Sequence, residues 1–296
     1  MQQLASPALG SKLAAYVALT KPRIIELLLV TTLPTMVVAH GGLPSGWLIA
    51  ATLTGGALAA GGANALNMVF DRDIDRVMHR TRKRPLVTGA IEPAQALAFA
   101  LTLEVAAFAL LWARVNLLSA VLAVSATAFY VIVYTLWLKR TSTNNIVIGG
   151  AAGAVPVLVG WAAVQDAIGL PPLVLFAVIF VWTPPHFWAL AVRYRDDYAA
   201  ADVPMLPAVA SMRTTAVRIL AYTLLLWALT LVFAPVAEMG LLYLAAAVVL
   251  GGVFTWLSVR LLRDPSPDRA MRLFTWSITY ITLLFGAMAV DQLLRP

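Results

Sequence analysis

The sequence contains no cysteine. This absence excludes disulfides, thiolate metal sites, iron–sulfur clusters and haem attached through thioethers. Charge is scarce too, because only 12% of the residues are Asp, Glu, Lys or Arg, whereas a soluble domain carries about a quarter. The N-terminal stretch has no arginine before Arg23 and no compact charged start, so it resembles neither a mitochondrial transit peptide nor a cleavable signal. We therefore expect a bacterial inner-membrane location.

Apolar residues are what the chain has in excess. They make up 61% of the 296 residues, and the mean hydropathy is +0.85. One soluble core cannot bury this much apolar surface, so the composition predicts an all-α, polytopic membrane protein. The net charge of +7 fits a cytoplasmic membrane face rich in Lys and Arg. Since no soluble domain remains to bind nucleic acid, we expect the lipid bilayer as a partner and no nucleic acid.

Nine apolar segments are long enough to span a bilayer. They cover residues 24–41, 47–70, 94–114, 116–137, 146–166, 172–193, 216–236, 240–262 and 272–292. With the N-terminus inside, all but Arg114 and Arg295 of the 21 Lys and Arg residues fall on the inner side, as the positive-inside rule requires. This predicts one transmembrane domain over 1–296, with a short cytoplasmic segment at 1–20. The two long inner loops lie four spans apart, which suggests two similar four-helix halves and a ninth helix.

The second span ends in the run NMVFDRDIDRV, which carries three aspartates within five positions. If the helix continues to about residue 76, four polar side chains fall within an arc of about 80°. These are Asn64, Asn67, Asp71 and Asp75. Asp73 then lies on the opposite side of the helix.

Two interpretations of this polar face stand side by side. Carboxylates four residues apart destabilise a helix unless a cation lies between them, and Mg²⁺ takes one or two carboxylates together with phosphate and water. On this basis Asp71, Asp75 and Asn67 are candidate Mg²⁺ ligands. In the alternative, the two aspartates are exposed and form ion pairs with nearby arginines. Those arginines are Arg72, Arg76 and Arg80.

Basic residues follow the second and the fourth spans. Arg80 and Arg84 lie in the run HRTRKRP, and Lys139 and Arg140 end the fourth span. All four are candidates for gripping a diphosphate, for which arginine offers bidentate contacts. The positive-inside rule explains them equally well, and the two interpretations are compatible.

The sixth span closes with a second charged run, WTPPHFWALAVRYRDDY. If the helix persists, Arg193, Asp196 and Asp197 are neighbours, either as an intrahelical ion pair or as a second Mg²⁺/diphosphate half-site. His186 lies about 10 Å deeper than Arg193, directly after two prolines. It is either a hydrogen-bonded core residue or an axial haem ligand.

Four runs of the sequence carry a family resemblance. They are LTKPRIIELLLVTTLPTMV (19–37), NALNMVFDRDIDRVMHRTRKRPLVTG (64–89), LKRTSTNNIVIGGAAGAVPVLVGWAA (138–163) and WTPPHFWALAVRYRDDYAAADVPMLP (182–207). These long motifs touch both halves of the chain. They resemble the protohaem IX farnesyltransferases, or haem O synthases, among the UbiA-type intramembrane prenyltransferases.

The resemblance implies nine transmembrane helices around a lipid-accessible central cavity. It places an N-x-x-x-D-x-x-x-D motif on Asn67, Asp71 and Asp75, which would be catalytic together with Lys139. The implied reaction transfers farnesyl from farnesyl diphosphate to a vinyl group of haem B, with addition of water, and gives haem O. Mg²⁺, or Mn²⁺ in its place, is the implied cofactor, haem B is a substrate, and haem A synthase is a candidate partner.

The charged runs and the polar helix face together give the predicted set of substrate-binding residues. This set comprises Asn64, Arg80, Arg84, Arg140, Arg193, Asp197 and His186. Relatives acting on quinone precursors carry a second D-x-x-x-D motif, but the stretch from Tyr194 to Tyr198 contains none, so only Asp197 is a candidate there. Asp202 stands where the family pattern has a small residue.

Three rival functions remain at this stage. A transporter also carries intramembrane charges, although usually near the midplane on broken helices. A prenyltransferase with another acceptor, such as a quinone precursor or chlorophyllide, would share the carboxylate motif. A haem chaperone would bind haem without catalysis and would leave Asp71 and Asp75 without a task.

Overall fold

The computed structural model describes residues 9–295, and within this range it contains helices and no strand. The helices are α1 (Leu9–Thr20), α2 (Pro22–His40), α3 (Gly46–Phe70), α4 (Arg72–Val77), α5 (Pro85–Thr88), α6 (Pro93–Arg114), α7 (Leu117–Ala128), the π-helix η1 (Phe129–Leu138), α8 (Lys139–Thr141), α9 (Asn145–Gln165), α10 (Leu170–Arg193), α11 (Arg195–Ala200), α12 (Leu206–Val209), α13 (Met212–Val236), α14 (Leu241–Arg263) and α15 (Pro267–Leu293). The predicted all-α class is confirmed. Of the predicted N-terminal segment 1–20, residues 1–8 lie outside the described range, and the rest forms α1.

Eight helices among the described residues are long and apolar enough to cross a membrane. They lie at the last eight predicted spans, with ends shifted by a few residues, and α7, η1 and α8 together form one of them. A helix, α2, also occupies the place of the first predicted span. Its apolar part is only Leu28–His40, because charged residues occur in its first turns. Eight of the nine predicted spans are thus supported, and the ninth stays a prediction.

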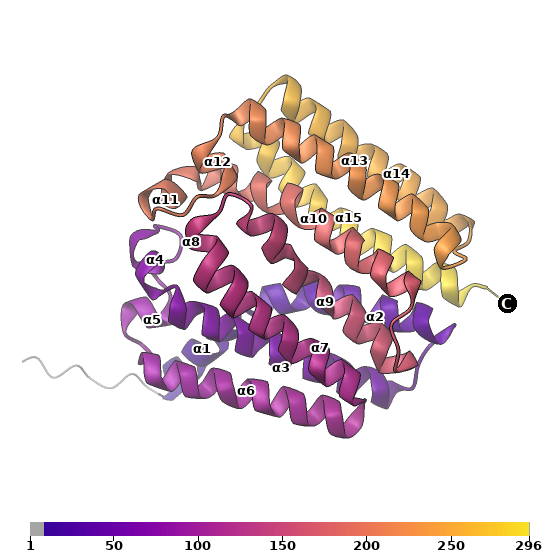
Figure 1. Ribbon diagram of the computed structural model, residues 1–296, viewed down its shortest axis with the longest axis horizontal. Helices are drawn as coiled ribbons and strands as arrows, with labels where there is room; N and C mark the ends of the chain where they lie inside the picture. Colours follow the sequence, from indigo (N-terminus) through magenta and orange to yellow (C-terminus); the bar gives the residue numbers. More distant parts are fainter. Residues whose placement is uncertain (1–8, 296) are drawn as a thin grey trace, which may run out of the picture.

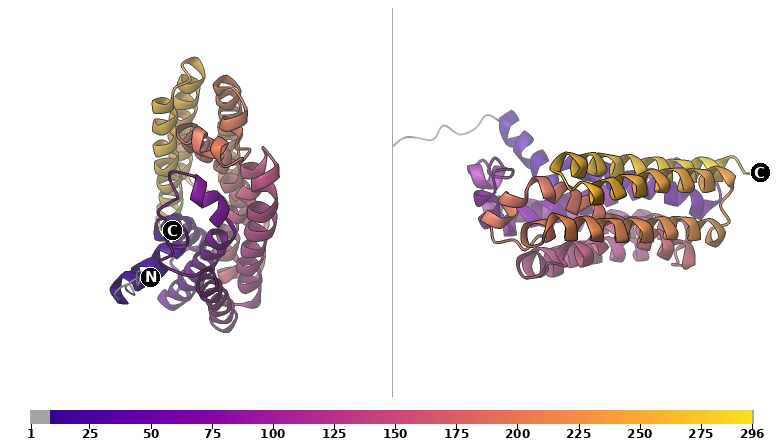
Figure 2. Two further views of the ribbon diagram at one scale, coloured as in Figure 1. Left: turned by 90° about the vertical axis from the view of Figure 1, so that its left-hand side faces the viewer. Right: turned by 90° about the horizontal axis from the view of Figure 1, so that it is seen from above.

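The long helices lie lengthwise in one elongated bundle (Figures 1 and 2). The short helices α4, α5, α8, α11 and α12 gather at one end of it, the left end in Figure 1, and the C-terminus lies at the other end. Helix α1 extends away from the bundle at the same end as the short helices (Figure 2). The loops that the sequence assigns to the inner side therefore share one end of the molecule.

Helix α10 is the most enclosed of the candidate spans. In its most apolar stretch 61% of the residues are buried, against 28–44% in the others. It packs on α9, α13 and α15, and its side chains Trp182 and Trp188 belong to the largest buried cluster. The second charged run predicted from the sequence therefore begins on the central helix of the bundle.

Helices α3 and α6 pack closely because α3 carries a glycine at their contact. A Cβ at Gly62 would lie 2.5 Å from Glu104 Oε1 and 3.0 Å from the carbonyl oxygen of Ala100. Small residues permit this approach between membrane helices. The Glu104 carboxyl also accepts a hydrogen bond from the Thr127 hydroxyl at 3.0 Å, which joins α6 to α7. This packing holds the helix that ends at the first aspartate cluster.

Candidate active site

The helix that carries the first polar cluster is interrupted at Asp71. Helix α3 ends at Phe70, Asp71 adopts φ −88° and ψ 7°, and α4 begins at Arg72. The predicted continuous helix to residue 76 is therefore wrong in this detail. Backbone hydrogen bonds still run from the Asp71 amide to Asn67 O (2.9 Å) and from the Asp75 amide to Asp71 O (2.8 Å). The chain thus bends without losing the spacing that brings Asn67, Asp71 and Asp75 to one region.

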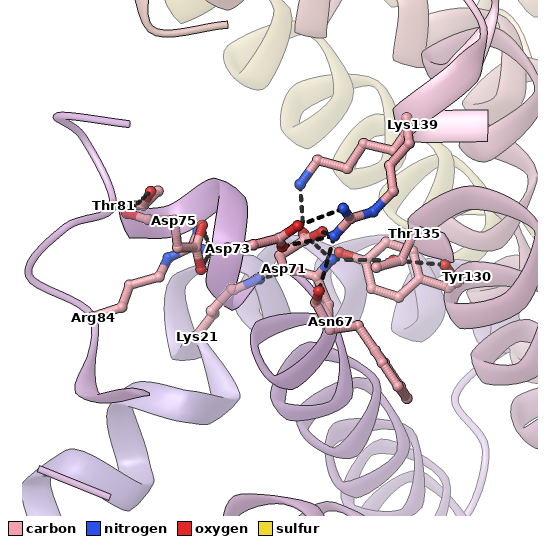
Figure 3. A network of polar contacts seen from close by, with 12 residues as sticks. Lys21, Asn67, Asp71, Asp73, Asp75, Thr81, Arg84, Tyr130, Thr135 and Lys139 are labelled. Atoms are coloured by element: carbon pink, nitrogen blue, oxygen red, sulfur yellow. Dashed lines mark hydrogen bonds and ion pairs between the residues drawn. The ribbon is translucent and has the colours of Figure 1, made fainter. Parts of the chain in front are cut away.

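Asp71 is completely buried and is held by two partners (Figure 3). Its Oδ2 accepts hydrogen bonds from Lys139 Nζ at 2.5 Å and from Asn67 Nδ2 at 2.7 Å. Its Oδ1 is buried without a hydrogen bond and lies 3.9 Å from Arg140 Nη2. A buried charge requires such compensation. Lys139 therefore neutralises Asp71, while one buried carboxylate oxygen is left without a hydrogen bond.

Asp75 is 2% exposed and pairs with the basic loop that follows it. Arg84 Nη1 donates to both carboxylate oxygens, at 2.8 and 2.6 Å, and the Thr81 hydroxyl donates to the Asp75 carbonyl oxygen at 3.2 Å. The alternative of exposed aspartates paired with Arg72, Arg76 or Arg80 is therefore wrong. The loop folds back onto α4, and Arg84 contacts a predicted metal ligand.

Lys21 is a member of this cluster that the sequence prediction missed. Its Nζ donates to Asn67 Oδ1 at 2.9 Å, and beside it Asn64 Nδ2 donates to the Thr20 carbonyl oxygen at 2.9 Å. Burial, together with the positive charges of Arg84 and Lys139, lowers the Lys21 pKa to about 7. The residue has φ 52°, a left-handed conformation that lysine rarely adopts. A lysine directly before Pro22 at a helix start was the only sequence signal.

A π-helix positions the side chains that reach Asn67 and Asp71 from the fourth predicted span. Over η1 the wider turn lets the Thr135 hydroxyl donate to the Tyr130 carbonyl oxygen, five residues back, at 2.9 Å. The same hydroxyl oxygen accepts from Asn67 Nδ2 at 3.1 Å. Lys139 follows directly after η1. Wide turns of this kind often occur at functional sites, and the sequence analysis did not foresee this one.

Asp73 lies apart from the other two aspartates, as predicted, and pairs with Arg140. Arg140 donates to both Asp73 oxygens, at 2.6 and 2.8 Å, and to the Phe70 carbonyl oxygen at 2.9 Å. The Arg140 hydrogen bonds hold the pKa of the Asp73 carboxyl at about 2, below its usual 3.8. Arg140 therefore ties α8 to α4, and its predicted role toward a substrate stays a prediction.

A cavity of about 360 Å³ lies beside this ion pair, lined by α4, Arg140 and the chain after α11. Asp202 is part of the lining and has φ 52°. Glycine adopts this left-handed conformation without cost, and aspartate tolerates it better than most residues. The small residue in the family pattern at this position thus has a conformational reason.

The second charged run does not form the predicted helical cluster. Helix α10 ends at Arg193 and α11 begins at Arg195, so the predicted ion pair between Arg193 and the following aspartates is not found in the described residues. Arg193 and Asp196 are exposed, and Asp196 contacts Arg195 only at 3.7 Å. The predicted second metal half-site is thus reduced to Asp197.

Asp197 joins the two charged runs at the end of the bundle where the short helices gather. Its Oδ2 accepts a hydrogen bond from the Arg80 backbone amide at 3.0 Å. The Arg80 guanidinium lies over the Tyr194 ring, 5.2 Å from its centroid. The basic loop after α4 is therefore attached to the segment after α10, although 117 residues separate Arg80 from Asp197.

His186 is buried within α10 among aromatic rings. Its ring stacks on Trp182 with centroids 4.3 Å apart and lies 4.7 Å from the Phe274 ring. Its Nδ1 is hydrogen-bonded to the Ser277 hydroxyl at 2.7 Å. The residue thus matches the core interpretation on the Nδ1 side of the ring, and its predicted contact with haem stays a prediction.

The cluster around Asp71 suits a metal that brings part of its own coordination shell. The described residues contain no group of three or more His, Cys, Asp or Glu side chains that could hold a metal alone. They offer the carboxylates of Asp71 and Asp75, with one Asp71 oxygen free of hydrogen bonds, and the Asn67 amide oxygen. Mg²⁺ is commonly bound through one or two carboxylates and completes its shell with substrate phosphates. The donor set therefore fits Mg²⁺ accompanied by a diphosphate.

Comparisons with known proteins agree with this chemistry. Residues 28–283 match the UbiA prenyltransferase family. A protein from Parafrankia sp. (strain EAN1pec), named protoheme IX farnesyltransferase, is 55% identical over 95% of this chain and 90% of its own length. A protein of the same name from Paenarthrobacter aurescens (strain TC1) is 52% identical over 97% of this chain and 93% of its own length.

Solved structures share the fold at low sequence identity. A digeranylgeranylglyceryl phosphate synthase superposes with a TM-score of 0.77 at 17% identity, covering 95% of this chain and 99% of that one. A UbiA homologue from Archaeoglobus fulgidus bound to GPP and Mg²⁺ superposes with a TM-score of 0.64 at 16% identity, covering 93% and 99%. The helical arrangement around the Asp71 cluster is therefore one that other solved membrane proteins adopt.

Proposed function

This chain belongs to the UbiA prenyltransferase family, and from that premise we propose that it is a protohaem IX farnesyltransferase. Its donor is farnesyl diphosphate and its acceptor is haem B. The bond between farnesyl C1 and the diphosphate oxygen breaks, and C1 bonds to a vinyl carbon of the haem. Water supplies a hydroxyl to the other vinyl carbon and releases a proton. The products are haem O and diphosphate.

The buried network at the end of α3 is the observation that carries this proposal. Asp71, Asp75 and Asn67 would hold Mg²⁺, or Mn²⁺ in its place, together with the diphosphate of the donor. When bound, the metal stabilises the negative charge that develops on the departing diphosphate. This arrangement has no task in a haem chaperone and lies at the inner end of the bundle rather than at its middle, which disfavours a transporter.

Cationic side chains of the protein would also stabilise the departing diphosphate. Lys139 and Arg84 pair with Asp71 and Asp75 at 2.5 and 2.6 Å, and Lys21 contacts Asn67. Fixed positive charges in a poorly solvated site stabilise developing negative charge more strongly than they do in water. A vinyl group attacks an allylic cation without a strong general base, so no catalytic triad is needed.

The acceptor half of the site is proposed to lie toward α10. His186 is the candidate for haem contact there, and the propionates would extend to the basic inner face. Arg80, Arg140 and Arg193 are the proposed anion-binding residues, with Asp197 fixing the backbone of Arg80 at 3.0 Å. Haem A synthase is a candidate recipient of the product.

The proposed location is a bacterial inner membrane, with the N-terminus and the active site on the cytoplasmic side and one domain formed by the whole chain. The distribution of Lys and Arg supports this orientation. Because the chain has no native cysteine, single cysteines can report it. Probes at Arg82 and Arg269 should be protected from outside intact cells, and one at Ala167 should be labelled. Labelling at position 82 from outside would overturn the orientation.

The reaction is tested by weighing the haem made in cells that express the chain but lack an enzyme of this activity. Extracted haem should gain the mass of one farnesyl group and one hydroxyl group, and Asp71→Asn should prevent the gain. Unchanged haem with a prenylated quinone precursor in the same cells would identify another acceptor. Unchanged haem and no turnover of farnesyl diphosphate in membranes containing Mg²⁺ would reject the prenyltransferase function.

A further inference from the structure

We propose that Ser277 on α15 is a positioning residue that fixes the tautomer of His186, so that Nε2 presents its lone pair to the iron of bound haem. This inference rests on the proposed function, since it requires haem as the acceptor. It adds to that function a way in which the haem acceptor is held. It also gives a role in holding haem to α15, a helix that lies outside both charged runs.

The hydrogen bonds around Ser277 determine where the imidazole proton lies. The Ser277 hydroxyl lies 2.6 Å from the Phe274 carbonyl oxygen and 2.7 Å from His186 Nδ1. A hydroxyl has one hydrogen, and a carbonyl oxygen only accepts. The hydrogen of Ser277 therefore goes to Phe274, and the hydroxyl oxygen accepts from His186 Nδ1–H. In the neutral ring Nε2 then carries no proton and keeps its lone pair.

The ring is held in place from several sides at once. Trp182 stacks on His186 with an interplanar angle of 21°, and its indole N–H donates to the Ser277 carbonyl oxygen at 2.9 Å. Phe274 lies 4.7 Å away on α15. Ser277 is fully buried, so water does not replace its hydroxyl. Rotation of the ring would break the Nδ1 contact and the stacking together.

The opposite edge of the ring is the one left for a ligand. Within the described residues Nε2 makes no hydrogen bond. It still differs from the unpartnered polar atoms of the core, because those are fully buried and Nε2 is not. Nε2 is therefore not completely covered, although the residue as a whole is only 6% exposed. Metal-binding histidines typically donate their other ring N–H to a protein acceptor, which fixes the tautomer and raises the ligand's basicity. Ser277 supplies that acceptor here.

This arrangement has a consequence for the reaction. His186 lies about 10 Å from Arg193 along α10, in the half of the helix that ends at Arg193, at the same end of the bundle as α4 (Figure 1). An iron ligand at this depth fixes the height of the porphyrin, and with it the height of the vinyl group that the farnesyl cation must reach. With the proton on Nε2 instead, the ring would point an N–H at the iron and could not bind it.

The test titrates the purified full chain in detergent with haemin, the ferric form of the acceptor, and follows the Soret band. His186→Ala should shift the band and weaken binding. Ser277→Ala should move the band in the same direction and weaken binding by about tenfold or more, the usual effect of losing an outer-shell partner. Ser277→Thr keeps a hydroxyl and should restore the wild-type band.

Ser258→Ala is the matched control. Ser258 is equally buried, and its hydroxyl also contacts a carbonyl oxygen, that of Phe254 at 3.0 Å, and a second side chain, Thr223, at 3.1 Å. It has no histidine partner, so this variant should bind haemin as the wild type does. Binding of a non-hydrolysable farnesyl diphosphate analogue should be unchanged in all these variants, which shows that they are folded.

Three results would overturn the inference. They are wild-type haemin binding in Ser277→Ala, an unshifted Soret band in His186→Ala, and a folded Ser277→Thr that loses the wild-type band. If Ser277→Ala does not fold, Ser277→Cys keeps a side chain of similar size but offers Nδ1 only a weak acceptor, so a shifted band supports the inference and an unshifted band contradicts it. A wild-type chain that binds the prenyl analogue but no haemin would instead reject haem as the acceptor in the proposed function.

Discussion

Two regions at the same end of the molecule have nearly the same composition and different structures. The segment after α3 and the segment after α10 each follow an apolar span with aspartates and arginines. In the first, Asp71 and Asp75 are 0% and 2% exposed, and each pairs with a cation within 2.6 Å. In the second, the side chain of Asp196 is fully exposed, and the one ion pair it forms with a described residue measures 3.7 Å.

The difference shows what a buried carboxylate requires. Removing a charge from water is costly unless partners compensate for it. In the first segment Asp75 pairs with Arg84 of the following loop, whereas Asp71 receives Lys139 from α8 and Asn67 receives Lys21 from before α2. In the second segment Asp196 contacts only its neighbour Arg195 and remains in solvent, and Asp197 receives a single backbone amide, that of Arg80. We therefore assign the diphosphate chemistry to the first segment, and assign positioning of the acceptor and of the basic loop to the second.

The largest expected effect is at the buried carboxylates. Asp71→Asn and Asp75→Asn should each lower the rate of haem O formation by about 100-fold or more, because each would remove a charged metal ligand that acts at the leaving group. Initial rates in membranes with saturating substrates measure this. Asp196→Asn is the matched variant in the second segment and should keep the wild-type rate. If Asp71→Asn and Asp196→Asn lower the rate of haem O formation equally, the two segments do not differ in function as proposed.

The next effect concerns stability. Lys139→Met leaves the charge of Asp71 buried without its closest cation, and should lower the free energy of unfolding by about 3 to 5 kcal/mol. Arg195→Met removes an exposed partner and should change it by less than about 0.5 kcal/mol. Denaturant unfolding in detergent gives both values. The double variant Asp71→Asn/Lys139→Met no longer buries an uncompensated charge, so it should recover part of the lost free energy of unfolding. If it is no more stable than Lys139→Met, the stabilisation by Lys139 does not come from neutralising Asp71.

A smaller effect is expected where the two segments meet. Asp197→Ala removes the acceptor for the Arg80 amide, and a hydrogen bond of this kind contributes about 1 kcal/mol. The KM for farnesyl diphosphate should rise about fivefold with kcat little changed, since the loop is loosened and no reacting group is lost. Steady-state kinetics separate the two constants. A fall in kcat as large as that of Asp71→Asn would instead place Asp197 among the metal ligands.

The smallest effect is on pH dependence at Asp73. Its pKa is about 2 in the folded protein against the usual 3.8, so the contact with Arg140 stabilises the fold above pH 3.8 and is lost as the pH falls toward 2. The side chain is 64% exposed, so the contribution is modest. Melting temperatures of the wild type and Asp73→Asn should differ slightly at pH 5 and converge near pH 2. If the melting temperatures still differ near pH 2, the Asp73–Arg140 contact stabilises the fold by a means other than the charge of Asp73.

The sequence predicts the elements of this molecule better than their contacts. Apolar length and charge bias locate the helices, and the spacing of Asn67, Asp71 and Asp75 indicates a shared face. The break at Asp71 was not foreseeable, because the helix pattern continues through it. The partner of Asp71 lies 68 residues away on Lys139, and periodicity along one helix does not reveal which other helix lies opposite.

Other features have no local signal at all. The π-helix η1 lies in a run of aromatic and β-branched residues that reads as ordinary α-helix. The contact between His186 and Ser277 joins residues 91 positions apart on two apolar helices. In the second charged run the sequence showed a signal that the structure does not follow. The spacing of its residues suggested a helical cluster, but helix α10 ends at Arg193.

The central claim, that the first segment alone holds the metal and the diphosphate, is tested most directly by equilibrium binding. The ligand is a non-hydrolysable farnesyl diphosphate analogue, measured with Mg²⁺ and with excess chelator on the wild type and two double variants. The account predicts that binding depends on Mg²⁺ in the wild type and in Asp196→Asn/Asp197→Asn. It predicts that this dependence is lost in Asp71→Asn/Asp75→Asn. Mg²⁺-dependent binding that survives in Asp71→Asn/Asp75→Asn and disappears in Asp196→Asn/Asp197→Asn would contradict it.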